Sequence, residues 1–245
     1  MRILEGQGVT KYFGGLAAVS NVDFHVDRGE IVGLIGPNGA GKTTLFNLAS
    51  GALPLSSGEI TFKGQKIRGL KPHRVCKMGV SRTFQETKVF GNMPVLQNVL
   101  VGAFFGSPNR ISAADAAREA SQALEFVGLL AMAGHSIQDL TLVSQKRVEV
   151  ARALATRPEL LLLDELMAGL NPAEVSEAME LVTKMRDTGI TVFMVEHVMK
   201  AIMGICERIM VLHHGEKIAE GTPQEIAANK TVIEIYLGEE TRAGS

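Results

Sequence analysis

A glycine-rich segment between two apolar runs constrains the fold of this chain more than any other feature. It consists of Gly36, Pro37, Asn38, Gly39, Ala40, Gly41, Lys42, Thr43 and Thr44, and it fits the phosphate-binding pattern G-x-x-x-x-G-K-[ST] at every fixed position. Residues 31–35 before it predict a buried parallel strand, and residues 45–49 after it predict the opening of a helix. This strand–loop–helix order separates the segment from a chance glycine-rich turn.

The residues of this loop suit the phosphates of a nucleoside triphosphate. Glycines let the backbone curl so that successive N–H groups point at phosphate oxygens. The N-terminus of the following helix adds the positive end of its dipole. Lys42 is expected to reach the β- and γ-phosphates, and the Thr43 hydroxyl is expected to bind Mg²⁺.

Composition excludes several classes of protein. The chain has 245 residues and a formal net charge of −1, which argues against a general nucleic-acid binder. Cys76 and Cys206 are too few and too far apart for a disulfide framework or a metal site, and two reduced thiols are expected. Residues 1–5 lack the apolar core of a signal peptide, and no apolar run is long enough to span a bilayer. Any work at a membrane is therefore expected to depend on a partner.

The first third of the chain is expected to be rich in strands around one helix. Val22, Phe24 and Val26 alternate with polar residues, which predicts a half-buried strand, and residues 58–63 predict a second one. Residues 94–156 differ, because apolar residues there recur at helical spacing. Ser112 is a candidate N-cap for a helix over 113–127, and a second helix is predicted over 144–156. We interpret 94–156 as a helical subdomain inserted in an α/β core.

Strands and helices alternate again after this insertion. Residues 160–164 predict a strand, 172–187 a helix and 190–195 another strand. Both strands are almost continuously apolar, as a parallel sheet buried on both faces requires. The sequence therefore predicts an α/β fold.

Acidic residues follow the first of these strands. Asp164 is placed to hold Mg²⁺, directly or through water. Glu165 is placed to polarise an attacking water as a general base. The alternative is an acidic strand-to-helix turn without a catalytic role.

Two further polar residues are expected at the same edge of the sheet. His197 follows the strand at 190–195, and Gln85 follows the segment 80–84. Ligands of open α/β sheets bind outside the carboxyl ends of the strands, so both residues are candidates for contact with the γ-phosphate, and Gln85 also for Mg²⁺. Taken alone, each could equally be a structural residue in a turn.

In the order of these motifs the chain resembles the ATPase subunits of ABC transporters along almost its whole length. Residues 36–44 match the Walker A loop, 82–85 the Q-loop, 162–165 the Walker B strand, 168–172 the D-loop and His197 the switch histidine. Residues 145–154 resemble the helix that follows the family's signature motif. The resemblance implies a P-loop NTPase (RecA-like) core, an N-terminal antiparallel β-subdomain and the inserted helical subdomain, within one ATPase domain over 1–245.

More narrowly, the chain is similar to the ATP-binding subunits of branched-chain amino acid importers. The matching residues are 12–19, 82–85, 168–172, 195–197 and 236–239. Phe13 matches the aromatic residue that stacks on adenine in the family, although a core position beside the first strand would also explain it.

The family resemblance implies both a mechanism and a set of partners. Two such subunits, identical or different, associate head to tail and enclose two MgATP between them, and closure drives a pair of polytopic permease subunits. The protein is then expected at the cytoplasmic face of the membrane, with a solute-binding protein as an indirect partner. Residues 82–100 are the expected docking groove, in which Phe90, Met93 and Val95 are groove lining or core.

The signature loop departs from the family pattern. Thr141 and Ser144 retain hydroxyls that could bond a partner's γ-phosphate, but Val143 replaces the usual glycine. A β-branched side chain resists a positive φ and adds bulk, so we expect slower hydrolysis or an altered but working dimer, and favour the second. Leu166 and Asn171 also differ from many members, without removing a charge from the site.

Two rival functions remain open at this point. A lipid or lipopolysaccharide exporter ATPase shares most of these motifs. A soluble ABC ATPase of DNA repair, translation or cofactor assembly is the other rival, although this chain has one cassette and no long coiled-coil pattern.

Overall fold

The computed structural model describes residues 1–85, 88–106 and 111–243. A six-stranded sheet forms its centre, in the order β10-β9-β3-β8-β7-β6. The strands are β3 (Ile31–Ile35), β6 (Val80–Arg82), β7 (Leu160–Asp164), β8 (Thr191–Val195), β9 (Arg208–His213) and β10 (Glu216–Gly221). The first five named pair in parallel and β10 pairs antiparallel with β9. All residues of β3, β7 and β8 are buried, which explains why these strands read as continuous apolar runs.

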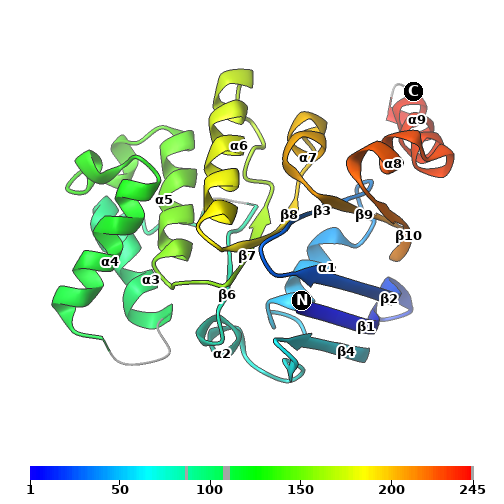
Figure 1. The fold of residues 1–245 in the computed structure, drawn as a ribbon, viewed down its shortest axis with the longest axis horizontal. Coiled ribbons are helices and arrows are strands. Elements are labelled where there is room, and N and C mark those ends of the chain that lie inside the picture. The colour runs from blue at the N-terminus through cyan, green and yellow to red at the C-terminus, as the bar shows by residue number, and fades with distance from the viewer. Residues whose placement is uncertain (86–87, 107–110, 244–245) are drawn as a thin grey trace.

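A second sheet is antiparallel and formed almost entirely from the first quarter of the chain. Its strands are β1 (Arg2–Phe13), β2 (Leu16–Asp27), β4 (Ser57–Phe62) and β5 (Gln65–Lys66), in the order β2-β1-β4-β5. β2 is longer than the strand expected around Val22–Val26, and its pairing with β1 contains several register shifts. The predicted N-terminal antiparallel subdomain is confirmed (Figure 1).

Helix α1 (Lys42–Ala49) lies between the two sheets and joins them into one core. The ring of Phe46 on α1 lies 4.8 Å from that of Phe193 on β8, and Phe24 from β2 lies 6.1 Å from Phe193. These contacts fix the helix that begins at the glycine-rich loop against the sheet that carries the acidic residues. These contacts therefore fix the position of the phosphate-binding loop relative to the acidic ends of the strands.

The segment between β6 and β7 is helical, as predicted. It contains α3 (Val95–Gly106), α4 (Ala113–Phe126) and α5 (Leu142–Leu154), with short 3₁₀ helices η1 (Leu130–Met132) and η2 (Ile137–Asp139). These helices pack together at one side of the molecule (Figure 1). Ser112 caps α4 by accepting a hydrogen bond from Asp115 N at 3.1 Å, as expected. Helix α5 begins two residues earlier than predicted, because Thr141 caps it.

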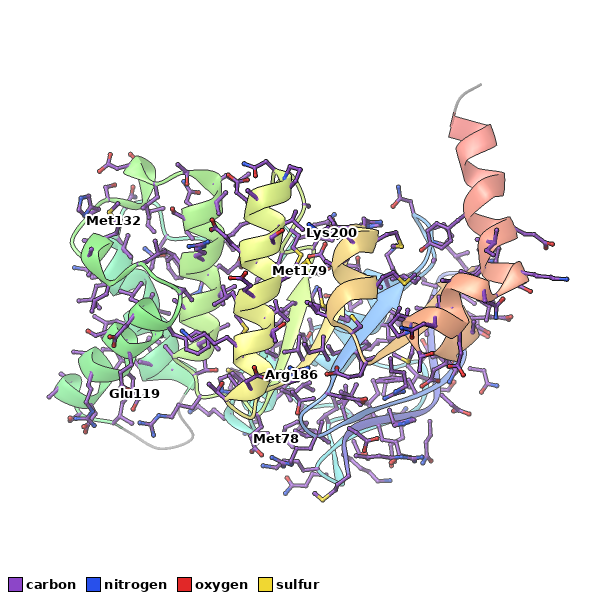
Figure 2. The ribbon with its side chains drawn as sticks, turned by 45° about the horizontal axis from the view of Figure 1, so that its top comes forward. Met78, Glu119, Met132, Met179, Arg186 and Lys200 are labelled. Carbon is purple, nitrogen blue, oxygen red and sulfur yellow. The ribbon has the colours of Figure 1, made fainter. Side chains whose placement is uncertain are left out.

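The remaining helices flank the central sheet. They are α2 (Pro72–Lys77), α6 (Pro172–Asp187), α7 (Met199–Ile205), α8 (Pro223–Ala228) and α9 (Lys230–Ala243). Figure 2 shows Met179 on α6 near Lys200 on α7, and the Lys200 ammonium donates to Ser176 Oγ at 3.1 Å. No helix among the described residues is long and apolar enough to cross a membrane.

Candidate nucleotide site

The glycine-rich loop connects β3 to α1 and has a backbone that only glycine allows at two positions. Gly36 and Gly41 have φ values of 150° and 101°. A Cβ atom at Gly36 would lie 2.1 Å from the carbonyl oxygen of Leu212, and one at Gly41 would lie 2.3 Å from that of Ala18. These close approaches give the loop its curvature. Helix α1 starts directly after Gly41 without a side-chain cap, which suits an anion at its N-terminus.

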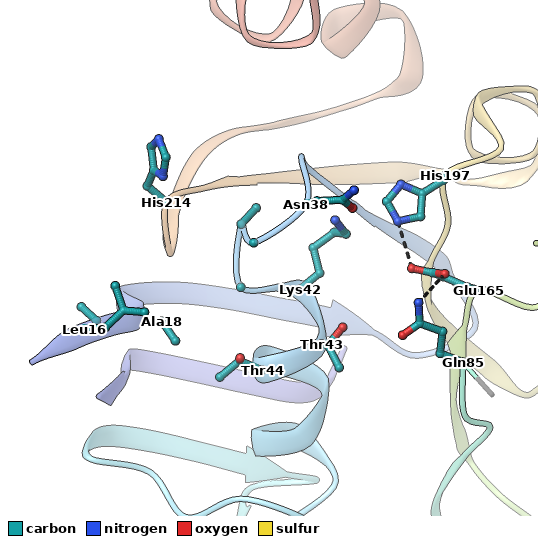
Figure 3. Close-up of a pocket in the computed structure, with 14 residues that line it drawn as sticks. Leu16, Ala18, Asn38, Lys42, Thr43, Thr44, Gln85, Glu165, His197 and His214 are labelled. Carbon is teal, nitrogen blue, oxygen red and sulfur yellow. Dashed lines mark hydrogen bonds and ion pairs between the residues drawn. The ribbon is translucent and has the colours of Figure 1, made fainter. Parts of the chain in front are cut away.

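Lys42 is buried under this loop. Its ammonium donates to the carbonyl oxygens of Gly36 at 2.6 Å and Pro37 at 2.8 Å. The side chain therefore lies along the inside of the loop rather than in solvent. In this position the positive charge faces the space that the loop surrounds (Figure 3).

That space is a pocket of about 300 Å³ at the carboxyl ends of the strands. Its lining contains ten of the predicted site residues, namely Asn38, Gly39, Ala40, Gly41, Lys42, Thr43, Thr44, Gln85, Glu165 and His197. Residues far apart in the sequence meet here because β7 and β8 are neighbours, and Asp164 pairs with Val195. Gly36 and Pro37 belong to the loop but do not line the pocket.

Glu165 connects the other two predicted catalytic residues. Its Oε2 accepts a hydrogen bond from Gln85 Nε2 at 2.9 Å, and its Oε1 lies 2.9 Å from His197 Nε2 (Figure 3). The Glu165 side chain is 13 % exposed and that of His197 is 46 % exposed. A carboxylate oriented from both sides and reachable from the pocket has the geometry of a general base.

Asp164 lies behind Glu165, below the surface of the pocket. The Arg82 guanidinium donates to its Oδ2 at 2.6 Å, and the two side chains are 8 % and 1 % exposed. Arg82 also donates to Asn47 Oδ1 on α1 at 2.5 Å. Arg82 was not among the predicted site residues, because an arginine near a strand end has no distinctive spacing.

The remaining oxygen of Asp164 suits a cation. Within the described part of the chain, Asp164 Oδ1 is buried and has no hydrogen-bond partner. A buried carboxylate oxygen normally has a partner, and Mg²⁺ prefers carboxylate, hydroxyl and phosphate oxygens. The residues present therefore fit Mg²⁺, with Asp164 and the pocket-lining Thr43 as candidate ligands.

The opposite end of the pocket is formed by residues that the sequence did not indicate. Leu16, Ala17 and Ala18 from β2 line it together with His214. His214 lies in the β9–β10 turn with a φ of 48°, and the next residue donates its N–H to Ala40 O at 3.0 Å, which fixes this turn against the loop. Two adjacent histidines in a turn match no motif, so the sequence did not predict that His214 lines the pocket.

Phe13 is not part of this lining. It is 47 % exposed at the end of β1, and the Lys11 ammonium lies 5.2 Å from the centre of its ring. It is therefore a surface residue and not the core residue that was the alternative. Stacking on adenine stays a prediction for Phe13.

The predicted signature loop forms the start of α5, away from the pocket. Thr141 Oγ1 accepts from Ser144 N at 3.3 Å and lies 3.2 Å from Ser144 Oγ, and neither residue lines the pocket. Val143 lies inside α5, and it is not among the described residues with a positive φ. A β-branched residue adopts this right-handed helical backbone without strain, and the effect of Val143 on hydrolysis or on the dimer stays a prediction.

The chain is similar to known proteins along almost its whole length. A family model described as "ABC transporter" matches residues 19–168, and one described as "Branched-chain amino acid ATP-binding cassette transporter" matches residues 216–241. The chain is 42 % identical to the high-affinity branched-chain amino acid transport ATP-binding protein LivG of Salmonella typhimurium, over 97 % of this chain and 98 % of that protein. It is 34 % identical to the lipopolysaccharide export system ATP-binding protein LptB of Escherichia coli, over 99 % and 100 % of the two chains.

A solved structure supports the same relationship. MJ1267, an ATP-binding cassette of an ABC transporter, superposes with a TM-score of 0.89 at 31 % identity, over 96 % of this chain and 99 % of that one. The match covers both sheets and the helices between β6 and β7. The predicted fold class is therefore confirmed.

Proposed function

Since the chain belongs to the ABC transporter ATP-binding family, we propose that it is the ATP-hydrolysing subunit of an importer for branched-chain or related amino acids. The observation that carries the catalytic part is the placement of Glu165 between Gln85 and His197, beside the phosphate-binding loop. The amino-acid part rests on the similarity to LivG and on the family match at residues 216–241. An exporter role has weaker support, because the identity to LptB is lower.

The site residues suggest how hydrolysis would proceed. The loop N–H groups, Lys42 and the α1 N-terminus bind the phosphates, which places the γ-phosphate near Glu165. Glu165 accepts a proton from the attacking water, Gln85 and His197 hold its carboxylate, and the products are ADP and phosphate. Thr43, Asp164 and Gln85 would hold Mg²⁺, which would supply positive charge to the phosphate oxygens.

A second ATPase subunit would complete the site. Thr141 and Ser144 are exposed or half-buried at the start of α5 and lie outside the pocket of their own subunit. This position supports a role for their hydroxyls at the nucleotide of another subunit. A head-to-tail dimer, homo- or heteromeric, brings each pocket against the other subunit's loop.

Membrane subunits would bind near the helical segment and hold the protein at the cytoplasmic face of the membrane. An open and mainly apolar cavity of about 530 Å³ lies between α2, α3 and α5, with Cys76, Phe84, Val101 and Phe105 in its lining. The expected docking segment, 82–100, overlaps it only in part, and residues 86–87 lie outside the described structure. Val95 is fully buried and belongs to the core, whereas Phe90 and Met93 are about 45 % and 38 % exposed.

Transport in proteoliposomes tests this proposal. The chain would be purified with its two permease subunits, and uptake of radiolabelled leucine would be measured with ATP supplied on the ATPase side. We expect uptake with the wild-type chain and none with Glu165→Gln. ATP hydrolysis without uptake of leucine, isoleucine or valine, even with the cognate binding protein present, would contradict the assignment to this class of solute.

A further inference from the structure

Behind the catalytic residues lies a layer of three buried charged side chains that do not line the pocket. Lys146 and Glu149 lie one turn apart on α5, and Glu196 precedes the predicted switch residue His197. They are 7 %, 3 % and 1 % exposed. Charged groups are almost never buried to this extent without specific partners, so their partners indicate what they do.

Lys146 is bonded to the turn that carries Glu165. Its ammonium donates to the carbonyl oxygens of Ala168 at 2.6 Å, Leu166 at 3.0 Å and Glu165 at 3.4 Å. Three carbonyl oxygens of one short turn thus converge on a single buried cation. The turn is thereby attached to α5, the helix that begins at the signature loop.

Glu149 and Glu196 bond to the segments on either side. Glu149 Oε1 accepts from Phe84 N at 3.2 Å, directly before Gln85. Glu196 Oε1 accepts from Met167 N at 2.8 Å, in the same turn that Lys146 holds. Burial raises the pKa of both carboxyl groups. The Arg152 charge opposes this shift most at Glu149, and the Met167 N–H and the Lys146 charge oppose it at Glu196. Glu149 therefore contacts the segment of Gln85, and Lys146 and Glu196 contact the turn of Glu165. Glu196 is itself the residue before His197.

The turn needs such support because its backbone is unusual. Glu165 has a φ of 50°, which a residue other than glycine rarely adopts. A left-handed conformation of this kind costs on the order of 1 kcal/mol or more and persists where surrounding contacts impose it. This φ sets the direction in which the Glu165 side chain leaves the backbone, toward Gln85 and His197.

We propose that Lys146 is a positioning residue for ATP hydrolysis, which holds the left-handed turn at Glu165 through its carbonyl oxygens. Because Lys146 lies on α5, it also connects the start of that helix, where Thr141 and Ser144 lie, to the general base of the same subunit. This inference rests on the proposed ATPase function. It requires that loss of Lys146 slows the chemical step but does not weaken the binding of the phosphates by the glycine-rich loop.

The test is Lys146→Met, which keeps the unbranched side chain at nearly its full length and removes its donors. We expect the KM for ATP and the affinity for a fluorescent ADP analogue to stay within about twofold, and kcat to fall about tenfold to a hundredfold, since small displacements of a catalytic group have effects of this size. Lys146→Arg should recover much of kcat, because a guanidinium can donate to the same carbonyl oxygens. Arg147→Met is the matched control, because Arg147 lies beside Lys146 on α5 and pairs instead with Glu177 on α6.

A folding defect must be separated from a positioning effect. Lys146→Met leaves the carboxyl group of Glu196 buried without its nearby cation. The double variant Lys146→Met with Glu196→Gln replaces that carboxyl group by a neutral amide, which can still accept a hydrogen bond from Met167 N. We expect this variant to bind the ADP analogue normally and to hydrolyse ATP as slowly as Lys146→Met. An unchanged kcat in a well-folded Lys146 variant, or equal losses of affinity and kcat, would overturn the inference. Absence of ATPase activity in the wild type would instead contradict the proposed function.

Discussion

Arg82 and Asp164 form a buried ion pair in which the guanidinium occupies one carboxylate oxygen, Oδ2, at 2.6 Å. The other oxygen, Oδ1, is buried and has no hydrogen bond from the residues that the structure describes. The pair therefore leaves a single oxygen of Asp164 for a further ligand. Arg82 is also bonded to Asn47, so it joins the acidic strand end to the P-loop helix.

Replacing Arg82 should alter the binding of the metal more than that of the nucleotide. In Arg82→Lys the charge stays but the two-pronged contact to Asp164 and Asn47 is lost. We expect the affinity for a fluorescent ATP analogue in EDTA to be unchanged, and the gain in affinity on adding Mg²⁺ to be smaller than in the wild type. Titration of Mg²⁺ with and without nucleotide measures this. An equal gain in both proteins would show that Arg82 does not orient Asp164.

Glu165→Gln should trap an ATP-bound dimer. The amide cannot accept the proton of water, but it can still bond His197 and Gln85, so the pocket keeps its shape. With saturating MgATP we expect a dimer on gel filtration and a loss of turnover of about a hundredfold or more, the usual contribution of a general base. A strictly monomeric profile under these conditions would count against the head-to-tail arrangement.

Val143→Gly tests the departure in the signature loop. Glycine in place of valine in the first turn of α5 costs roughly 0.5 kcal/mol in helix propensity, so the variant should be slightly less stable in thermal unfolding. Removal of the side chain should nevertheless raise ATP-driven dimerisation or turnover if bulk at this position limits closure. Lower stability with no change in either quantity would show that Val143 is only a helix residue.

Glu196 should make the stability of the protein depend on pH. Burial raises its pKa from 4.5 to about 7, so between these values the folded protein holds a proton that the unfolded chain has released. Stability should therefore fall as pH rises through this range, by about 3 kcal/mol at most for a shift of this size. Urea unfolding of the wild type and Glu196→Gln at about pH 5 and about pH 8 measures this difference. The glutamine variant should gain stability relative to the wild type at the higher pH, and an equal dependence in both proteins would assign the effect to other groups.

Phe13→Ala should show whether the adenine ring stacks on Phe13 or contacts the side chains that line the pocket. Phe13 is exposed beside the pocket, whereas Leu16, Ala18 and His214 line it. Loss of a stacked aromatic ring would weaken ATP binding by about 1 kcal/mol, or roughly fivefold. Isothermal titration with ATP and with pyrophosphate distinguishes the outcomes, since only ATP binding should weaken. An unchanged affinity for ATP would indicate that Leu16 and His214, and not Phe13, contact the purine ring.

The sequence by itself determined the parts of the site that depend on local patterns. The loop at 36–44 needs glycines at two crowded positions, and buried strands need continuous apolar runs, so both are visible in short windows of sequence. Because the carboxyl ends of parallel strands meet at one edge, the sequence predicts His197 and Gln85 near the phosphates, and Asp164 does pair with Val195.

Only the tertiary structure decided which side chains support those residues and which line the rest of the pocket. Arg82 reaches Asp164 because β6 pairs with β7, and Lys146 reaches the turn at Glu165 because α5 packs beside it. His214 lines the pocket because its turn is bonded to the P-loop, and Val143 is unstrained because Thr141 caps a regular helix. Such contacts join residues distant in the chain through packing, and their residue types recur at many other positions without this role.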